Sequence, residues 1–326
     1  MKKVKVLIAV AAHYSRSRAF ESFLKEECYD VRVVTRDMSN KYNFMNFFRE
    51  IISWKPQIVH AINDPEVMLI PIILASKLVG ANVLYDVRGI CSLLRKETRR
   101  NDMYYYVERF AERFNDIFSD RKITPVYRIH KKRNYALIPQ TISFRKRVCH
   151  ARHGKKQIIL TACTLSKMRE LEVLIDSMRF IQNPDVELWI FGDGVEKEKI
   201  EAEAKKDSRI FVFGRIPYDL FIKKIPRADV CIIPFSKMIS SEYTSPYSVL
   251  KLGEFTFFQK PIVCADVGDM RLAEKNGVVF YKPGDSKDLA VKISSQLKNP
   301  KKTTFFRELD RKDVKKKYLA VVRSLF

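Results

Sequence analysis

The sequence predicts an α/β protein with two domains in series, each built on a doubly wound parallel sheet. The chain has 326 residues, and a single hydrophobic core rarely grows that large, so two domains of roughly 150 residues are expected. In both halves, short runs of Val, Ile and Leu alternate with helical stretches. This alternation is typical of parallel strands covered by helices on both faces. Residues 141–156 are charged and lack periodicity, which indicates a linker.

The first half gives a regular succession of strands and helices. Its strands are predicted at 4–12, 30–37, 57–62, 82–89 and 135–140, and its helices at 15–27, 41–54 and 65–80. Residues 90–134 differ, because they are basic and aromatic and carry few strand signals. Within them Phe110, Phe114 and Phe118 recur every four residues, which predicts a helix with its aromatic stripe toward the core. A membrane-surface patch is the alternative.

The second half repeats the alternation. Its strands are predicted at 157–163, 186–194, 209–214, 229–235, 261–266 and 278–283, and its helices at 168–181, 195–206, 217–225, within 245–260, and at 285–299. The predicted domains are therefore 1–145 and 146–310. We expect residues 311–326 to form a terminal helix that packs back on the first domain.

Charge is the strongest feature of the composition. Lys and Arg total 61 against 38 Asp and Glu, a formal net charge of +23. An anionic partner such as lipid, nucleic acid or phosphorylated ligands would explain this excess, and so would a generally Lys-rich surface. Nucleic acid is disfavoured, because no known nucleic-acid-binding module appears.

The sequence favours a reduced cytoplasmic protein. Six cysteines lie far apart without a CxxC pair, and Cys231 and Cys264 stand in apolar runs where they read as small buried hydrophobes. The chain opens directly into an apparent strand rather than a signal peptide. Its longest apolar stretch, 67–85, is broken by Pro71, Lys77, Gly80 and Asn82, which argues against a membrane-spanning helix. We expect a location in the cytoplasm, with peripheral binding to the inner face of the cell membrane as an option.

Several motifs follow one another in a characteristic order. In the second half these are "LTACTLSKMRELEVLIDSM" (160–178), "VELWIFGDG" (186–194), "VFGRIPYDLFIKKIPRADVCIIPF" (212–235) and "SPYSVLKLGEFTFFQKPIV" (245–263). The first half contributes "VAAHYSRSRAFESFL" (10–24), "KPQIVHAIND" (55–64) and "VLYDVRG" (83–89). Their order resembles that of family-4 glycosyltransferases, which have the GT-B fold of two facing Rossmann-like domains.

This resemblance implies a retaining, metal-independent hexosyltransferase. It would move sugar from a nucleoside-diphosphate sugar to a glycan or lipid-linked acceptor, and it would need no cofactor. An NAD-dependent oxidoreductase is poorly supported, because the chain has only 10 Gly and no GxGxxG motif after its first strand. The sequence has no acidic DxD-type cluster at a place where it would indicate a metal site.

Glu254 is the residue with the most specific expected role in donor binding. Read alone, Lys251 and Glu254 would be an ordinary solvated ion pair on a helix. The resemblance implies instead that the Glu254 carboxylate accepts hydrogen bonds from both ribose hydroxyls. The loop and helix start at 245–250, with Ser248 and Val249, would hold the diphosphate through backbone N–H groups.

Further donor contacts are expected around this helix. Lys251 and Arg215 would add positive charge, while Gly192 and Gly194 in "FGDG" would allow close backbone approach to the donor. A strand-to-helix turn would need these glycines in any case.

Lys167 and Arg169 are the expected catalytic cations. By resemblance they clamp the donor diphosphate and neutralise the charge that builds on it as it leaves. The alternative is an ordinary charged helix start. The family pattern has an Arg where Thr164 stands and often a Glu where Pro246 stands. These departures support a second hypothesis, a catalytically inert GT-B protein that binds nucleotide sugar or assembly partners, and a sugar epimerase of the same fold is a third.

The first domain supplies the expected acceptor side of the cleft. Arg16 and Arg18 follow the first strand and would contact phosphate, or else form a solvated turn. His60 and Asp64 come at the end of another strand, where a buried His60 without a substrate role is an equal alternative. Asp86 and Arg88 in "YDVRG" would border the acceptor pocket.

Overall fold

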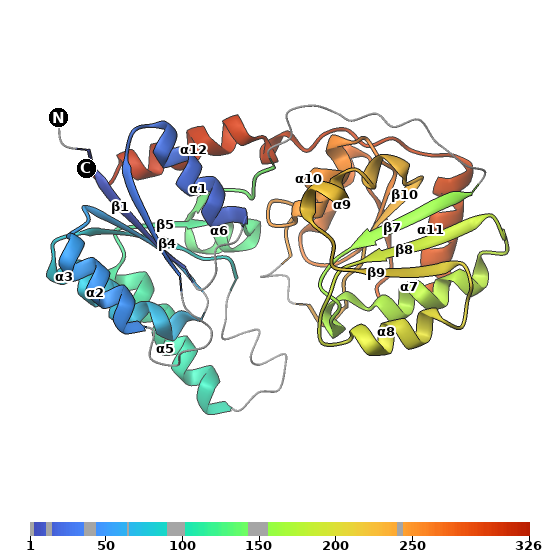
Figure 1. Cartoon of the computed structure of the whole chain (residues 1–326), viewed down its shortest axis with the longest axis horizontal. Coiled ribbons are helices and arrows are strands. Elements are labelled where there is room, and N and C mark those ends of the chain that lie inside the picture. The colour runs from blue at the N-terminus through green and yellow to red at the C-terminus, as the bar shows by residue number, and fades with distance from the viewer. Residues whose placement is uncertain are drawn as a thin grey trace. The chain divides into compact units, whose positions relative to one another are not determined.

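The computed structural model shows two compact units in the chain (Figure 1). It describes residues 3–10, 15–35, 44–63, 65–89, 102–142, 156–239 and 244–326. One unit comprises Met1–Thr141 together with Glu308–Phe326, and the other comprises Ile142–Arg307. The chain thus passes from the first unit to the second between residues 141 and 142 and returns between 307 and 308. The sequence predicts these boundaries at 145/146 and 310/311.

The first unit is built on a parallel sheet. Within the described residues this sheet has six strands in the order β2-β1-β3-β4-β5-β6. The strands are β1 (Lys5–Val10), β2 (Asp30–Thr35), β3 (Ile58–Ile62), β4 (Asn82–Asp86), β5 (Arg121–Thr124) and β6 (Ala136–Leu137). The central strand β3 is fully buried, as expected for a strand with helices on both faces. The predicted fold class is confirmed here.

Helices cover both faces of this sheet. The first face carries α1 (Ser15–Glu26) and α12 (Arg311–Arg323), and the second carries α2 (Phe44–Trp54) and α3 (Leu69–Leu78). Alternate residues of β1 show the division, because Val6 and Ile8 pack on the α1 face whereas Leu7 and Ala9 pack on the α2 face. Further helical elements among the described residues are η1 (Glu66–Met68), α5 (Asp102–Phe118) and α6 (Tyr127–Arg133), and η6 (Arg307–Leu309) lies where the chain returns to this unit.

The last helix, α12, completes the first unit although it lies at the end of the chain. Tyr318 is fully buried, its ring stacks on Phe20 with centroids 4.1 Å apart, and its hydroxyl lies 3.0 Å from His60 Nδ1. At the surface Lys315 forms ion pairs of 3.0 Å with Glu26, the last residue of α1, and 2.9 Å with Glu27, which follows it. Burial of an aromatic side chain supplies most of this attachment, because exposed ion pairs contribute little.

Two expectations for residues 90–134 are wrong. Strand β5 lies in a segment predicted to be helical with few strand signals, whereas α6 agrees with that prediction. The aromatic stripe of α5 also faces outward, since Phe110 is 66% exposed and Phe118 is 45% exposed, and only Phe114 packs partly on the core. The helix instead buries Glu108, Ala111, Glu112 and Asn115.

The second unit repeats the parallel architecture. Its described strands form a six-stranded sheet in the order β12-β11-β10-β7-β8-β9. These are β7 (Gln157–Ala162), β8 (Val186–Phe191), β9 (Ile210–Gly214), β10 (Val230–Ile233), β11 (Ile262–Ala265) and β12 (Val279–Tyr281). The helices are α7 (Leu171–Ser177), α8 (Lys197–Ala204), α9 (Tyr218–Ile222), α10 (Leu250–Phe257) and α11 (Ser286–Lys298), with 3₁₀ segments η2 (Lys167–Arg169), η3 (Met178–Phe180), η4 (Ile225–Arg227) and η5 (Met270–Asn276).

Two further expectations concern burial and membrane insertion. Cys231 and Cys264 are both at 0% exposure within their strands, as the apolar runs around them predict. Among the described residues, no helix has the length and apolar character needed to cross a membrane.

A buried ion pair ties three segments of the first unit together. Arg16 of α1 donates Nε to Asp86 Oδ2 at 2.7 Å and Nη2 to Asp86 Oδ1 at 3.0 Å. Its Nη1 donates to the carbonyl oxygens of Ile138 at 2.9 Å and Pro139 at 3.0 Å. Burial alone would raise the pKa of Asp86, but Arg16 and His60 outweigh burial and hold that pKa at about 2. Arg16 and Asp86 are thus a structural pair that joins α1, β4 and the segment after β6.

We predict that Asp86→Asn destabilises the first unit by about 3–5 kcal/mol near pH 7, because it leaves the Arg16 charge buried without its partner. Since the folded pKa of Asp86 lies below its ordinary value of 3.8, the charged pair contributes fully above about pH 4 and loses its contribution as the pH falls toward 2. The difference between variant and parent should shrink over that window. Urea unfolding followed by Trp54 fluorescence, in a Trp189→Phe background, reports the first unit alone.

The exposed residue Asp30 provides the control, and Asp30→Asn should change stability by less than about 0.5 kcal/mol. Equal unfolding of Asp86→Asn and its parent near pH 7 would show that the pair does not support the unit.

Candidate functional site

The strand order of the second sheet points to a ligand site at one place. Strand β7 lies between β10 and β8, and the chain runs from β7 to β8 and β9 before it returns to β10 on the other side. In open parallel sheets, ligands bind outside the carboxyl ends of the strands where the order reverses. The segments after β7 and β10 therefore form the candidate site.

These two segments are joined by hydrogen bonds. The Ser236 N–H after β10 donates to the Met168 carbonyl oxygen of η2 at 2.9 Å, and the Ser236 hydroxyl donates to Glu170 Oε1 at 2.8 Å. Glu170 has the left-handed backbone conformation, with φ 42° and ψ 45°, which is uncommon for a residue with a side chain. The short segment from 167 to 170 is thus held in a defined shape against the β10 loop.

Arg169 is the charged group that this shape positions. Its guanidinium carbon lies 4.3 Å from the centre of the Phe235 ring, and Nη1 lies 3.5 Å from the Pro234 carbonyl oxygen. The side chain is half-buried, and burial lowers its pKa. Within the part of the chain that the structure describes, no carboxylate forms an ion pair with it. A cation that is partly removed from water and lacks an anionic partner is well suited to bind an anionic ligand.

The neighbouring positions are open to solvent. Lys167 lies on the same 3₁₀ turn and is exposed, as is Thr164 just after β7. Lys167 and Arg169 therefore belong to one turn at the end of the central strand, and the two differ in burial.

Gly192 and Gly194 have a packing role between two loops. A Cβ on Gly192 would lie 1.8 Å from the Cys163 carbonyl oxygen, and one on Gly194 would lie 2.3 Å from the Leu165 carbonyl oxygen. The loops after β7 and β8 also exchange backbone hydrogen bonds, including Leu165 N–H to Asp193 O at 3.0 Å. The glycines thus allow close backbone approach, and the partner seen in the structure is the loop after β7.

Lys251 and Glu254 are not a solvated surface pair. Glu254 is 1% exposed, and its Oε2 accepts a hydrogen bond from Lys251 Nζ at 2.7 Å. Its Oε1 accepts one from the Tyr218 hydroxyl at 3.1 Å, and burial together with the Glu254 charge raises the pKa of Tyr218. Lys251 Nζ also lies 4.1 Å from the centre of the Phe221 ring. A carboxylate offers about four lone-pair sites, so Glu254 can accept further hydrogen bonds.

Tyr218 and Phe221 were not identified from the sequence. Both lie on α9, about thirty residues before Lys251 and Glu254 on α10. The segment "RIPYDLFI" (215–222) contains both, but nothing in it indicates contact with Glu254. Arg215 is exposed and directly follows β9.

In the turn before α10, the Ser248 hydroxyl already forms hydrogen bonds within the turn. Ser248 Oγ donates to the Ser245 carbonyl oxygen at 2.9 Å and accepts from the Ser245 N–H at 3.3 Å. Val249 is the N-cap residue, and no side chain caps the helix. Any anion at this helix start would therefore be held through backbone N–H groups.

The expected acceptor-side residues of the first unit have different roles. Arg16, Asp86 and His60 are buried and contact one another, with His60 Nε2 3.6 Å from Asp86 Oδ2. This arrangement corrects the expectation that Arg16 contacts phosphate and that Asp86 borders the acceptor pocket, because their charges neutralise each other inside the unit. For His60 the buried alternative is the one observed, and burial lowers its pKa.

Three further residues of the first unit were expected on the acceptor side of the cleft. Arg18 is exposed in the first turn of α1. Arg88 is half-buried, and its N–H donates to Asn63 Oδ1 at 2.8 Å. Asp64 lies outside the described residues.

A polar network at the carboxyl ends of β3 and β4 was also missed. Glu66 is fully buried and accepts hydrogen bonds from the Tyr85 hydroxyl at 2.5 Å and from Asn63 Nδ2 at 2.6 Å. Asn115 Nδ2 of α5 donates to the same carboxylate at 2.9 Å, and burial raises the pKa of Glu66 to about 7. The network fixes η1 and α5 at the carboxyl ends of β3 and β4.

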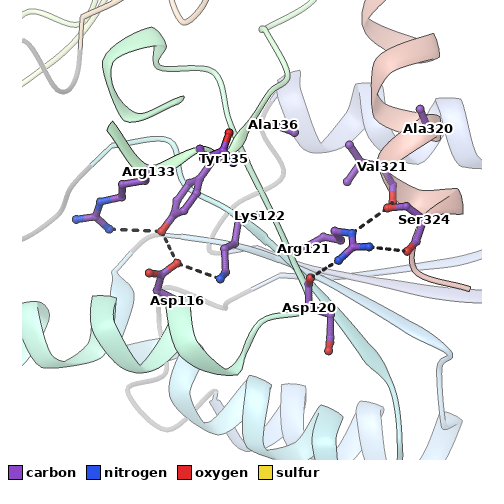
Figure 2. A pocket seen from close by; sticks show the side chains of 11 residues that line it. Asp116, Asp120, Arg121, Lys122, Arg133, Tyr135, Ala136, Ala320, Val321 and Ser324 are labelled. Atoms are coloured by element: carbon purple, nitrogen blue, oxygen red, sulfur yellow. Dashed lines mark hydrogen bonds and ion pairs between the residues drawn. The ribbon is translucent and has the colours of Figure 1, made fainter. Parts of the chain in front are cut away.

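The first unit also contains a cavity of about 560 Å³ at the amino ends of strands in its sheet (Figure 2). Arg121, the first residue of β5, lies there, and its Nε donates a hydrogen bond at 3.0 Å to the hydroxyl of Ser324, just after α12. Asp116 accepts a hydrogen bond from the Tyr135 hydroxyl at 2.5 Å and lies 3.4 Å from Lys122 Nζ, and Asp120 lies 2.6 Å from Lys77 Nζ. This cavity lies at the amino ends of β5 and β6, where parallel sheets rarely bind substrate.

Comparisons with known proteins find a family match within the second unit. Residues 156–299 match a family model described as "Glycosyl transferases group 1". No curated protein matches the chain by sequence.

Solved structures show the same overall fold. Anabaena HepE in complex with UDP has a TM-score of 0.64 at 14% identity and covers 98% of this chain and 100% of its own. The apo lipopolysaccharide outer core galactosyltransferase WaaB has a TM-score of 0.68 at 12% identity, over 99% of this chain and 100% of its own. Sucrose-phosphate synthase from Thermosynechococcus elongatus has a TM-score of 0.71 at 14% identity, over 99% of this chain and 96% of its own.

The family match covers the second sheet together with η2 and α10, which carry Arg169 and Glu254, and the structural matches extend over both units. The comparisons agree with the resemblance found in the motifs: residues 156–299 match the model of the group 1 glycosyl transferases, and the chain has the two-domain GT-B fold.

Proposed function

We propose that the protein is a retaining glycosyltransferase that moves a hexosyl group from a nucleoside-diphosphate sugar to a glycan or lipid-linked acceptor. The observation that carries this proposal is Arg169, a half-buried cation without an ion-pair partner among the described residues, at the reversal point of the second sheet. A donor diphosphate is the anion that suits this position in a group 1 glycosyl transferase domain. The UDP complex of HepE supports the choice of a nucleotide ligand.

In this proposal the donor binds through two elements of the second unit. Glu254 accepts the ribose hydroxyls, and Lys251, Arg215 and the backbone at Ser248 and Val249 surround the phosphates. Gly192 and Gly194 shape the β8 loop beside the Arg169 turn, and this packing is the support for their place near the donor.

The chemistry requires positive charge at the leaving group. When the bond between the sugar C1 and the diphosphate breaks, the electron pair passes to the diphosphate oxygen, which gains negative charge. Arg169 and Lys167 would stabilise that charge, so the proposed reaction needs no metal ion. Retention results if the acceptor attacks from the face that the diphosphate leaves.

A catalytically inert, nucleotide-sugar-binding protein is the second candidate. It is favoured by Glu254, whose two oxygens already accept hydrogen bonds from Lys251 and Tyr218, and by the buried Pro246 where many relatives have a glutamate. A thermal-shift screen with UDP-, GDP- and ADP-sugars, followed by a turnover assay with each stabilising donor, separates the candidates. Stabilisation without turnover supports the inert protein, and no stabilisation by any donor contradicts both.

We predict that Glu254→Gln weakens UDP binding by about tenfold to a hundredfold, because it removes charge-assisted hydrogen bonds to the ribose. Isothermal titration calorimetry measures the dissociation constant, and thermal unfolding checks that the unit stays folded. Glu187→Gln is the matched control, since Glu187 pairs with Lys156 near the amino end of β8. The ribose role is wrong if both variants bind UDP as tightly as the wild type.

We predict that Arg169→Gln lowers kcat by about a hundredfold to a thousandfold. The KM for the donor should change less, because the leaving group gains most of its charge in the transition state. The release of nucleoside diphosphate from the stabilising donor gives the rate. Arg179→Gln, which changes an exposed arginine paired with Asp176, should leave the rate unchanged. Full activity of Arg169→Gln would exclude Arg169 as the leaving-group cation.

A further inference from the structure

Helix α5 presents its apolar side to solvent and its polar side to the interior. Its buried side chains include Glu108, Glu112 and Asn115, at 1%, 3% and 0% exposure. Tyr106, Phe110 and Ile117 are 69%, 66% and 71% exposed, and Val107 and Phe118 are 41% and 45% exposed. In a helix that covers a core in water, the apolar face is normally the buried one.

Hydrogen bonds hold α5 in this orientation. Asn115 Nδ2 donates to the Glu66 carbonyl oxygen at 3.0 Å and to its side-chain Oε2 at 2.9 Å, and Glu108 Oε2 accepts from the Glu66 N–H at 3.0 Å. Ser119, just after the helix, donates to the Asn115 carbonyl oxygen at 2.5 Å. A rotation that buried the aromatic residues would leave these buried polar groups unpaired, at a large cost.

The exposed residues form a continuous strip. Tyr106, Phe110 and Ile117 follow helical spacing along one side, and Phe114 bridges the gap, with its ring 6.5 Å from Phe110 and 4.4 Å from Phe118 between centroids. The helix has 17 residues, so it is about 25 Å long. Figure 1 shows its N-terminal end projecting beyond α2 and α3 of the same unit.

The charges on α5 favour an anionic partner. Arg109 and Arg113 are exposed, and the Arg109 side chain retains 53% of its accessible surface although its Nη1 lies 3.8 Å from Glu112 Oε2. The acidic residues Glu108 and Glu112 are turned inward, and Asp116 lies 3.4 Å from Lys122 Nζ. The exposed side of the helix thus combines aromatic and aliphatic residues with arginines, in a chain of net charge +23.

We propose that α5 lies flat on an anionic lipid membrane, with Tyr106, Val107, Phe110, Ile117 and Phe118 in the interface and Arg109 and Arg113 on lipid phosphates. Aromatic and aliphatic side chains on one helix face enter the boundary between headgroups and acyl chains, and adjacent arginines add attraction to anionic lipid. This binding rests on the first unit alone and does not require donor binding or turnover.

The test is flotation of the full chain with vesicles of phosphatidylcholine alone or with about 30 mol% phosphatidylglycerol, a fraction that gives a negative surface potential. We expect the wild type to bind the anionic vesicles and to bind them less at high salt. The variant Phe110→Ser/Ile117→Ser should lower the partition coefficient by about tenfold or more. Arg109→Gln/Arg113→Gln should also lower it by about tenfold, on anionic vesicles only.

Phe326→Ser is the matched control, because Phe326 is also 66% exposed but lies at the chain end, and it should bind as the wild type does. Thermal unfolding and UDP binding should be unchanged in Phe110→Ser/Ile117→Ser, which separates a loss of membrane binding from a loss of fold or donor site. Three results would overturn the proposal: no binding of the wild type, equal binding by Phe110→Ser/Ile117→Ser, or a wild-type dimer that this variant converts to a monomer without any vesicle binding.

Discussion

The parallel pairing of β7 with both β10 and β8 is the constraint on which the candidate site depends. It brings the carboxyl ends of three strands to one edge of the second sheet, so that segments far apart in sequence meet there. Arg169 reaches Phe235 of the β10 segment, and Gly194 allows the β8 loop to approach Leu165. The rigid sheet thus holds a partly desolvated guanidinium in place, and the proposed diphosphate site follows from that position.

The sequence predicted the sheets well because buried parallel strands are nearly continuous apolar runs. Strand β5 was missed because it has four residues and begins with Arg121 and Lys122. For α5 the periodicity correctly showed which residues share a face, but it could not show which face is buried. That choice depends on the hydrogen bond that Glu108 accepts from the Glu66 N–H and on the one that Asn115 donates to Glu66, which lies some forty to fifty residues away.

The same reasoning explains the outcome for the site residues. Motif order singles out Arg169, which ends the 3₁₀ turn after β7, and Glu254, which lies within α10, and their roles in donor binding stay predictions. Arg16 and Asp86 are 70 residues apart, and their pairing inside the first unit is not visible in either motif. Tyr218 likewise contacts Glu254 from another helix. A residue's type and spacing therefore indicate what it can bind, whereas only the packed structure shows which partner it has.

The central claim is that Glu254 recognises the ribose of a nucleotide in the second unit. It is tested most directly by calorimetric titration of wild type and Glu254→Ala with UDP and with 2′,3′-dideoxy-UDP. The four dissociation constants are then compared as in a double-mutant cycle. The account predicts that removal of the two hydroxyls weakens binding to the wild type by about tenfold or more and has little effect on the variant. Equal binding of both nucleotides by the wild type would contradict it.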